Sequence, residues 1–157
     1  MITDIEAMFA AITYCRIGLS QGQSPFGAAI VKNGELISVA YNTVRLENDP
    51  TAHAEVNAIR RASQSLNSFD LSNCILYSTC EPCPMCLAAT HWSRVDRLVF
   101  GASIADAESA GFREMPIAAK TMVELGKSPL KIEGGLLVVE CRALFEQWKN
   151  SPSAQPY

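Results

Sequence analysis

The sequence lacks a long apolar run, a cluster of basic residues and a recognisable leader. No apolar stretch approaches the ~20 residues needed to span a bilayer. The longest basic run is Arg60-Arg61, and the net charge is −3, which argues against general nucleic-acid binding but leaves a local RNA site open. The first residues, MITDIEAMFA, have no basic region typical of a signal peptide. We therefore expect a soluble, cytoplasmic protein.

The chain also lacks internal repeats and any linker that would divide it. Its 157 residues, 48% of them hydrophobic, suffice for one domain with a substantial core. It has six cysteines, and in a reducing compartment these are thiols or metal ligands more often than disulfides.

Apolar periodicity predicts an opening helix and hairpin, followed by alternating helices and strands. Asn33-Gly34, between two apolar runs, is a strong hairpin signal, and Asp4 is the expected cap of the first helix. We expect strands at 27–32, 35–41, 74–80, 97–102 and 136–140. We expect helices at 4–20, from the turn at 49–51 to about 66, and at 84–94, 104–110, 116–125 and 142–149. This alternation predicts an α/β sandwich whose sheet is covered by helices on both faces.

The segment CEPCPMC concentrates three cysteines, Cys80, Cys83 and Cys86. An iron–sulfur run with this spacing would need a fourth cysteine at position 90, where Thr90 stands. A redox pair Cys83–Cys86 has the required C-x-x-C spacing and stays open on composition alone. A zinc site requires a further ligand, for which histidine is the usual residue.

The chain has only two histidines, and one of them completes a known pattern. His53 and Glu55 in TAHAEV, followed by Pro82, Cys83 and Cys86, match H-x-E…P-C-x-x-C, the signature of zinc deaminases. His53, Cys83 and Cys86 are therefore the predicted ligands of one Zn²⁺. They would leave the fourth zinc position open for water, which is typical of a catalytic site, and soft sulfur ligands favour zinc over other divalent metals.

Both halves of the pattern open a predicted helix, where free N–H groups and the helix dipole favour thiolates. Pro84 suits the first helical position, because its missing N–H would have no partner there. Glu55 is expected to carry protons rather than to bind metal. Residues at i and i+2 of a regular helix do not face each other, so His53 is expected at an irregular helix start.

The remaining cysteines and the second histidine have structural interpretations. Cys80 is expected to support the site by packing, since three sulfurs and an imidazole would close the zinc site to water. His91 follows Cys86 by five positions, or about 500° of helical rotation, and should lie away from it, on a helix face or a pocket wall. Three cysteines lie within apolar patterns and are predicted core residues: Cys15, Cys74 and Cys141.

The segments NDPTAHAEVNAIRRA and LYSTCEPCPMCLAATHWSRV resemble the cytidine deaminase-like superfamily. The resemblance covers residues 1 to about 115 well and 116–140 poorly. It implies a three-layer α/β/α sandwich with a mixed five-stranded sheet, in a single zinc-dependent deaminase domain over 1–157. Within the superfamily, GQSPFGAAIVKNG, DAESAGFRE and FEQWKNSPSAQPY resemble bacterial guanine deaminases.

This resemblance also implies which residues contact a base. Glu114 matches an acidic residue after Gly-Phe-x; its carboxylate would accept the N–H donors that guanine offers at N1 and N2 and could shuttle protons. Arg113 departs from the acid often found beside it. Asn42 matches the residue that binds the polar edge of the base. Three more residues are expected beside the base: Phe26, Ala54 and Trp92.

The resemblance gives a role to the C-terminal segment as well. It implies that the helix and tail at 142–157 close over the pocket, with Tyr157 contributing to it. Related enzymes form dimers, some with exchanged tails, so a homodimer is expected. Composition alone predicts that SPSAQPY is a flexible tail.

The leading functional hypothesis is zinc-dependent hydrolytic deamination of a free nucleobase, guanine to xanthine and ammonia. Cytosine, another purine or a related heterocycle are alternative substrates. A tRNA adenosine deaminase is a further alternative, disfavoured by the acidic composition and by DAESAGF, where that family tends to carry a lysine and small residues. An inactive zinc-binding interaction module is the non-enzymatic alternative, and the intact Glu55 argues against it.

Overall fold

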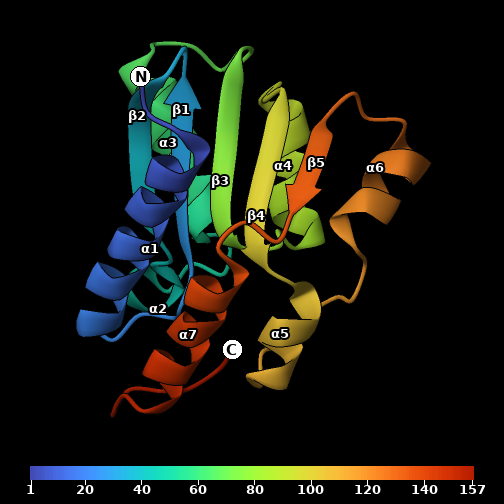
Figure 1. The fold of residues 1–157 in the computed structure, drawn as a ribbon. Coiled ribbons are helices and arrows are strands. Elements are labelled where there is room, and N and C mark those ends of the chain that lie inside the picture. Colours follow the sequence, from blue (N-terminus) through green and yellow to red (C-terminus); the bar gives the residue numbers. More distant parts are fainter.

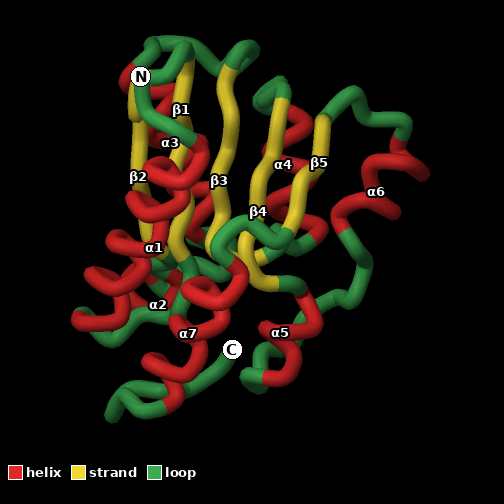
Figure 2. Tube along the Cα trace, in the orientation of Figure 1, coloured by secondary structure: helices red, strands yellow, loops and turns green.

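A computed structural model describes residues 1–157 as a mixed five-stranded sheet between two layers of helices (Figures 1 and 2). The strands are β1 (Gly27–Lys32), β2 (Glu35–Tyr41), β3 (Cys74–Cys80), β4 (Arg97–Ala102) and β5 (Lys131–Gly134). Their spatial order is β2-β1-β3-β4-β5. Strand β1 runs antiparallel to β2 and β3, whereas β3, β4 and β5 are parallel. The predicted three-layer fold is confirmed.

The helices divide between the two faces of the sheet. On one face lie α1 (Asp4–Ser20) and α7 (Val138–Lys149), and on the other α3 (Ala54–Ser65), α4 (Pro84–Trp92) and α6 (Ala119–Gly126). The short helices α2 (Val44–Glu47) and α5 (Ile104–Ser109) lie with the C-terminus at the end of the sheet where β3 and β4 finish (Figure 1). None of the helices is both long and apolar enough to cross a membrane.

Each face of the sheet carries its own hydrophobic core. Strand side chains alternate between the faces, so Ala29 and Val31 pack with α1 and α7, while Ala28 and Ile30 pack with α3 and α4. The hairpin between β1 and β2 is the tight turn that Asn33-Gly34 predicts, with φ of 52° and 78° at these residues.

The first helix is capped by a different residue from the one predicted. Thr3, not Asp4, is the N-cap, and Thr3 and Glu6 form a capping box. Asp4 instead accepts hydrogen bonds from the Arg97 guanidinium at 2.6 Å and from the Tyr77 hydroxyl at 2.6 Å. Its carboxylate therefore ties α1 to the sheet.

The last strand and its neighbouring helices differ from the prediction. The expected strand at 136–140 is wrong: the edge strand β5 is Lys131–Gly134, and α7 already begins at Val138. Gly135 (φ 89°) and Leu137 (φ 51°) turn the chain in the left-handed region, which ends the strand before the apolar run. Helix α6 begins at Ala119 rather than 116, and α2 was not predicted.

Candidate active site

Two helices begin at the same end of the sheet, each next to a predicted metal ligand. His53 is the N-cap of α3 and Cys83 the N-cap of α4, both with extended backbone. Neither side chain caps its own helix, so both can face the space between the helix starts. Pro84 takes the first helical position, as predicted. The irregular start expected for His53 is present, and it removes the conflict between His53 and Glu55 at i and i+2.

The three predicted ligands converge on one point. His53 Nδ1 lies 3.4 Å from Cys86 Sγ and 3.7 Å from Cys83 Sγ, and the three ligand atoms lie within 4.8 Å of one another. Tetrahedral coordination with zinc–sulfur and zinc–nitrogen bonds of about 2.3 and 2.0 Å separates nitrogen from sulfur by about 3.5 Å. Both the geometry and the soft donor set therefore fit zinc. Cys86 is buried, whereas His53 and Cys83 are half-buried and border a cavity.

The two thiols are electrostatically unequal. A hydrogen bond with Cys86, and a further one with His53, lower the pKa of Cys83 to about 4 despite its burial. The pKa of Cys86 is raised, because it hydrogen-bonds the Cys83 sulfur and is buried. One thiolate is thus formed at neutral pH, and a cation that touches both sulfurs favours ionisation of the second.

Glu55 lies in the first turn of α3 and lines the same cavity as His53 and Cys83. Its side chain is only 6% exposed, and Oε1 accepts a hydrogen bond from the Ser78 hydroxyl at 3.2 Å. Burial raises the pKa of Glu55, with the charge of His53 acting in the opposite direction. A raised pKa makes the Glu55 carboxylate a stronger proton acceptor than an exposed glutamate.

Glu114 is the second carboxylate of the cavity and comes from a stretch without regular secondary structure between α5 and α6. Burial and the nearby Cys83 sulfur raise the pKa of Glu114 to about 7, although His53 lowers it. The cavity therefore holds two acidic groups from unrelated parts of the chain, one on a helix and one on a loop.

Aromatic rings form a wall of this cavity. Phe26, which precedes β1, lines it directly and meets the edge of Phe112 at a centroid distance of 5.0 Å. Phe112 in turn packs on Trp148 of α7 at 4.7 Å. This wall links the cavity to the core beneath α7.

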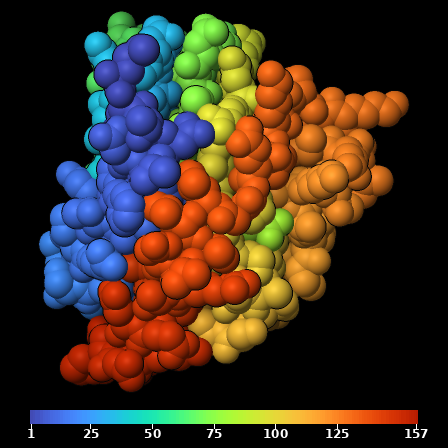
Figure 3. All heavy atoms as spheres, viewed as in Figure 1, coloured from blue at the N-terminus to red at the C-terminus, as the bar shows by residue number.

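The C-terminal tail folds back over the cavity of its own chain. The Tyr157 hydroxyl accepts a hydrogen bond from Asn42 Nδ2 at 2.5 Å, and its ring lies 5.9 Å from that of His53. Arg45 of α2 holds the tail by hydrogen bonds to the Ser153 carbonyl at 2.7 Å and to Gln155 Oε1 at 3.2 Å. Beyond α7, the red C-terminal segment covers the lower end of the molecule in Figure 3.

Three predicted base contacts do not line this cavity: Asn42, Ala54 and Trp92. Asn42 is buried behind Tyr157, to which it is hydrogen-bonded. Ala54 is fully buried in the core at the start of α3. The expectation that Trp92 lies beside the base is not met within the chain: Trp92 is 80% exposed. It follows Cys86 by six positions, or about 600° of rotation, so it points to another side of α4.

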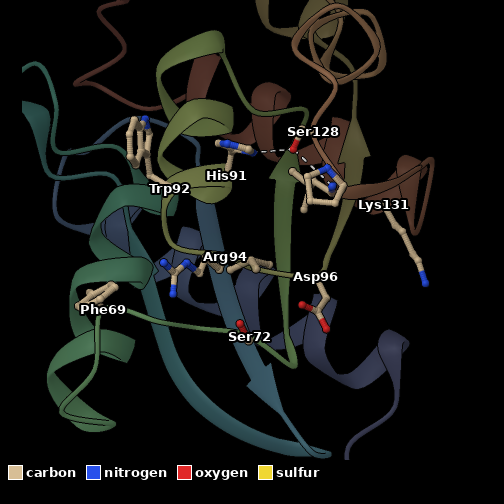
Figure 4. A pocket seen from close by; sticks show the side chains of 11 residues that line it. Phe69, Ser72, His91, Trp92, Arg94, Asp96, Ser128 and Lys131 are labelled. Atoms are coloured by element: carbon tan, nitrogen blue, oxygen red, sulfur yellow. Dashed lines mark hydrogen bonds between the residues drawn. The ribbon is translucent and has the colours of Figure 1, made fainter.

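Trp92 instead lines a separate cavity of about 680 Å³. Figure 4 shows this cavity, in which His91 hydrogen-bonds Ser128 at 2.7 Å and the Arg94 guanidinium lies 5.5 Å from the centre of the Phe69 ring. It contains neither the candidate metal ligands nor Glu55. His91 therefore lies away from Cys86, as the helical period predicts.

Three residues at or near the site were not singled out from the sequence. Glu81 lines the cavity between Cys80 and Cys83, Phe112 builds its wall, and Arg45 holds the tail. The position of Glu81 inside CEPCPMC was a usable signal. No sequence signal marked Arg45, because its hydrogen-bond partners lie more than 100 residues further along the sequence.

A His-Cys-Cys set with an open side, next to a buried carboxylate that is not a ligand, is the arrangement of a catalytic zinc site of the kind found in zinc deaminases. The chain belongs to the family of cytidine and deoxycytidylate deaminases: the model of their zinc-binding region matches residues 1–102. It is thus a zinc-dependent hydrolytic deaminase by family, and the predicted superfamily is confirmed.

Individual relatives fall into two groups. The chain is 50% identical to a guanine deaminase of Bacillus subtilis over 148 residues, 94% of each chain. It is 36% identical to a tRNA-specific adenosine deaminase of Buchnera aphidicola over 141 residues, 90% of each chain. Among solved structures, the guanine deaminase from Nitrosomonas europaea superposes with a TM-score of 0.86 at 30% identity, covering 94% of this chain and 85% of that chain.

Proposed function

We propose that the protein hydrolyses guanine to xanthine and ammonia at this site. The observation that carries the proposal is the Glu114 carboxylate in the same cavity as His53 and Glu55. All three bases carry an N–H donor in the amine that leaves, but only guanine adds a ring donor, N1–H, beside the carbon that loses its amine; the ring nitrogen beside that carbon in cytosine and adenine is an acceptor. A carboxylate at this place complements guanine. The 50% identity to the Bacillus subtilis guanine deaminase supports the same choice.

In this proposal, His53, Cys83 and Cys86 hold the zinc ion. Zinc bound there would supply an activated water with a pKa of about 7. Glu55 accepts a proton from the attacking water, delivers it to the ring nitrogen and later helps the amine to leave as ammonia. Glu114 accepts the N–H groups of the base and assists proton delivery to the leaving amine.

The side-chain amide of Asn42 is oriented for a complementary contact. Asn42 Oδ1 accepts the Val44 N–H at 3.2 Å, which turns the NH₂ group toward Tyr157, a residue that lines the cavity. This NH₂ group can donate to an acceptor of the base, such as the guanine carbonyl. Phe26 would flank the base, and Ala54, without a bulky side chain, would leave room for it at the start of α3.

We propose that the segment 142–157 closes the active site, with its helical part fixed in the core and the tail beyond α7 as the movable lid. With Tyr157 hydrogen-bonded to Asn42, the inner cavity measures about 20 Å³, too small for a purine. An outer cavity of about 270 Å³ shares His53, Cys83, Glu114 and Tyr157 with the inner one. The base therefore enters when the tail lifts, and the tail closes again over it.

The proposal includes a homodimer formed through α4 and α6. Trp92 and Leu125 are each 80% exposed, and an apolar groove of about 520 Å³ between the two helices contains Leu87 and Met122. Exposed apolar patches of this kind mark protein interfaces. Sedimentation of the wild type should give twice the mass of one chain, and Leu125→Glu should shift it to one chain. A monomeric wild type would refute this part.

The test of the proposed activity is ammonia release from guanine, cytosine, adenine, cytidine, guanosine and tRNA anticodon stem-loops. We expect turnover of guanine with xanthine as product, and none in Glu55→Gln, which is the matched control for contaminating deaminases. Activity on the RNA alone would assign the chain to the tRNA deaminases instead.

A further inference from the structure

Glu81 is a carboxylate at the site that the mechanism above does not use. It lies between the end of β3 and the metal-binding segment Pro82–Cys86 and lines the inner cavity. Its Oε2 accepts the backbone N–H of Ile104 at 3.1 Å, and its Oε1 accepts that of Ala119 at 2.8 Å. Its own N–H donates to the Ala102 carbonyl at 2.7 Å. One carboxylate thus joins three parts of the chain.

The two N–H groups that Glu81 accepts stand at equivalent places. Ile104 is the first residue of α5 and Ala119 the first residue of α6, and both are buried. First-turn N–H groups have no partner within their helix, and a negative charge is favoured there. Glu81 supplies that partner at both helices, so replacing it leaves two buried donors without an acceptor.

The segment between these two anchors carries Glu114. From Phe112 to Ala118 it forms no regular secondary structure, and its internal hydrogen bonds run only from Glu114 to Phe112 and from Ile117 to Met115. Phe112 is held by aromatic packing, and Arg113 donates its N–H to the Tyr157 carbonyl at 3.4 Å. On the side of α6, the hydrogen bond of Ala119 to Glu81 is the anchor nearest to Glu114.

We propose that Glu81 is a positioning residue that sets the place of the Glu114 carboxylate relative to the metal ligands. It does so by fixing both ends of the segment 104–119 to the chain that enters the Cys83–Cys86 turn. Glu81 touches neither metal nor base in this role. The inference rests on the proposed function of Glu114 and adds the element that links the loop-borne carboxylate to the helix-borne zinc site.

The test compares Glu81→Gln with Glu124→Gln, an exposed carboxylate of α6 without a side-chain hydrogen bond. Glutamine keeps the length of glutamate but turns an NH₂ group toward one of the two N–H donors. We expect Glu81→Gln to keep its zinc content and to lose kcat roughly 10- to 100-fold, with a smaller rise in KM, because proton transfer tolerates less displacement than binding. Glu124→Gln should behave as the wild type.

A double-mutant comparison separates positioning from general destabilisation. In a Glu114→Gln background, Glu81→Gln should change kcat per bound zinc less than twofold, since the group that it positions is already lost. An undiminished loss in that background would overturn the proposal. A zinc content that falls in parallel with kcat would also overturn it, because Glu81 would then act through the metal.

Amide hydrogen exchange gives a readout that needs no substrate. At least one of the Ile104 and Ala119 amides should exchange faster in Glu81→Gln than in the wild type or Glu124→Gln, since glutamine keeps only one acceptor oxygen. Unchanged protection of both amides would refute the proposal. Failure of the proposed function appears elsewhere, as a wild type that does not deaminate guanine. The kcat values would then be compared with whichever base the wild type deaminates. The comparison of amide hydrogen exchange would need no change, because it uses no substrate.

Discussion

The metal-binding half and the proposed base-binding half of the site are built in different ways. The metal ligands lie at or within the first turn of two regular helices that pack against each other and lie on one face of the sheet. The proposed base-binding side relies on Glu114, in a stretch without secondary structure, and on Tyr157, at the end of the described chain. The first half is fixed by the core, and the second by a few hydrogen bonds and aromatic contacts.

In the proposed function, the residues that carry out the chemistry and the residues that select the substrate therefore lie in different parts of the fold. Ligands at helix starts keep the sub-ångström geometry that a metal requires, because the core restrains both helices. Loops and tails can vary without disturbing the core, and binding specificity commonly resides in them. The family model accordingly matches residues 1–102 and ends before Glu114 and Tyr157.

The largest expected effect lies in the metal half. Glu55→Gln should lower kcat for guanine by roughly 10²- to 10⁴-fold, because it removes the proton carrier while preserving side-chain volume. Zinc content, measured by elemental analysis, should stay at that of the wild type. Unchanged turnover would contradict the assigned role of Glu55, and loss of zinc would make it a ligand.

A smaller effect is expected from the loop-borne carboxylate. Glu114→Ala should lower kcat/KM for guanine roughly 10- to 100-fold, the value of a hydrogen bond to a charged group. Glu124→Ala, at an exposed carboxylate, is the matched control. Steady-state ammonia release gives both values, and equal activity of the two variants would show that Glu114 lies outside the reaction.

The tail should contribute less than either carboxylate. Tyr157→Phe removes only the hydroxyl that accepts the Asn42 N–H, and we expect roughly a 3- to 10-fold loss in kcat/KM. Deleting 154–157 should cost more and leave the zinc content and the fold intact. Full activity after the deletion would show that residues 154–157 have no role in the reaction.

The smallest expected effect is a change in the pH dependence of kcat/KM, which should depend on Glu114 in the proposed base-binding half. Burial and Cys83 raise the pKa of Glu114 to about 7, and bound zinc would lower it, so the acidic limb of kcat/KM should lie at or below pH 7. Activity should fall as the pH drops through this value, because a protonated Glu114 no longer accepts both N–H groups of the base. Glu114→Gln should lack this limb, and an unchanged limb would assign it to another group.

Much of the metal half could be predicted from the sequence, because local rules determine it. Pro84 and the turn before His53 mark helix starts, and the hairpin at Asn33-Gly34 is equally local. The spacing of His53, Cys83 and Cys86 indicates one cluster, and the fold brings the three side chains together.

The base half and the sheet edge were less predictable, because tertiary contacts determine them. Strand β5 has only four residues and one apolar residue, Ile132, so its sequence shows no strand period. The β-branched pair Val138-Val139 favours a strand, yet the left-handed turn at Leu137 starts a helix there. Trp92 shows the same limit, since its aromatic character did not reveal which side of α4 it faces.

The most direct test of the account is the ratio of kcat/KM for guanine to that for adenine, measured by ammonia release in the wild type and in Glu114→Ala. We predict a wild-type ratio well above 1 that falls in the variant, because Glu114 accepts the ring N1–H donor that guanine has and adenine lacks. A wild type that prefers adenine, or a ratio unchanged by Glu114→Ala, would contradict the claim that this loop selects the base.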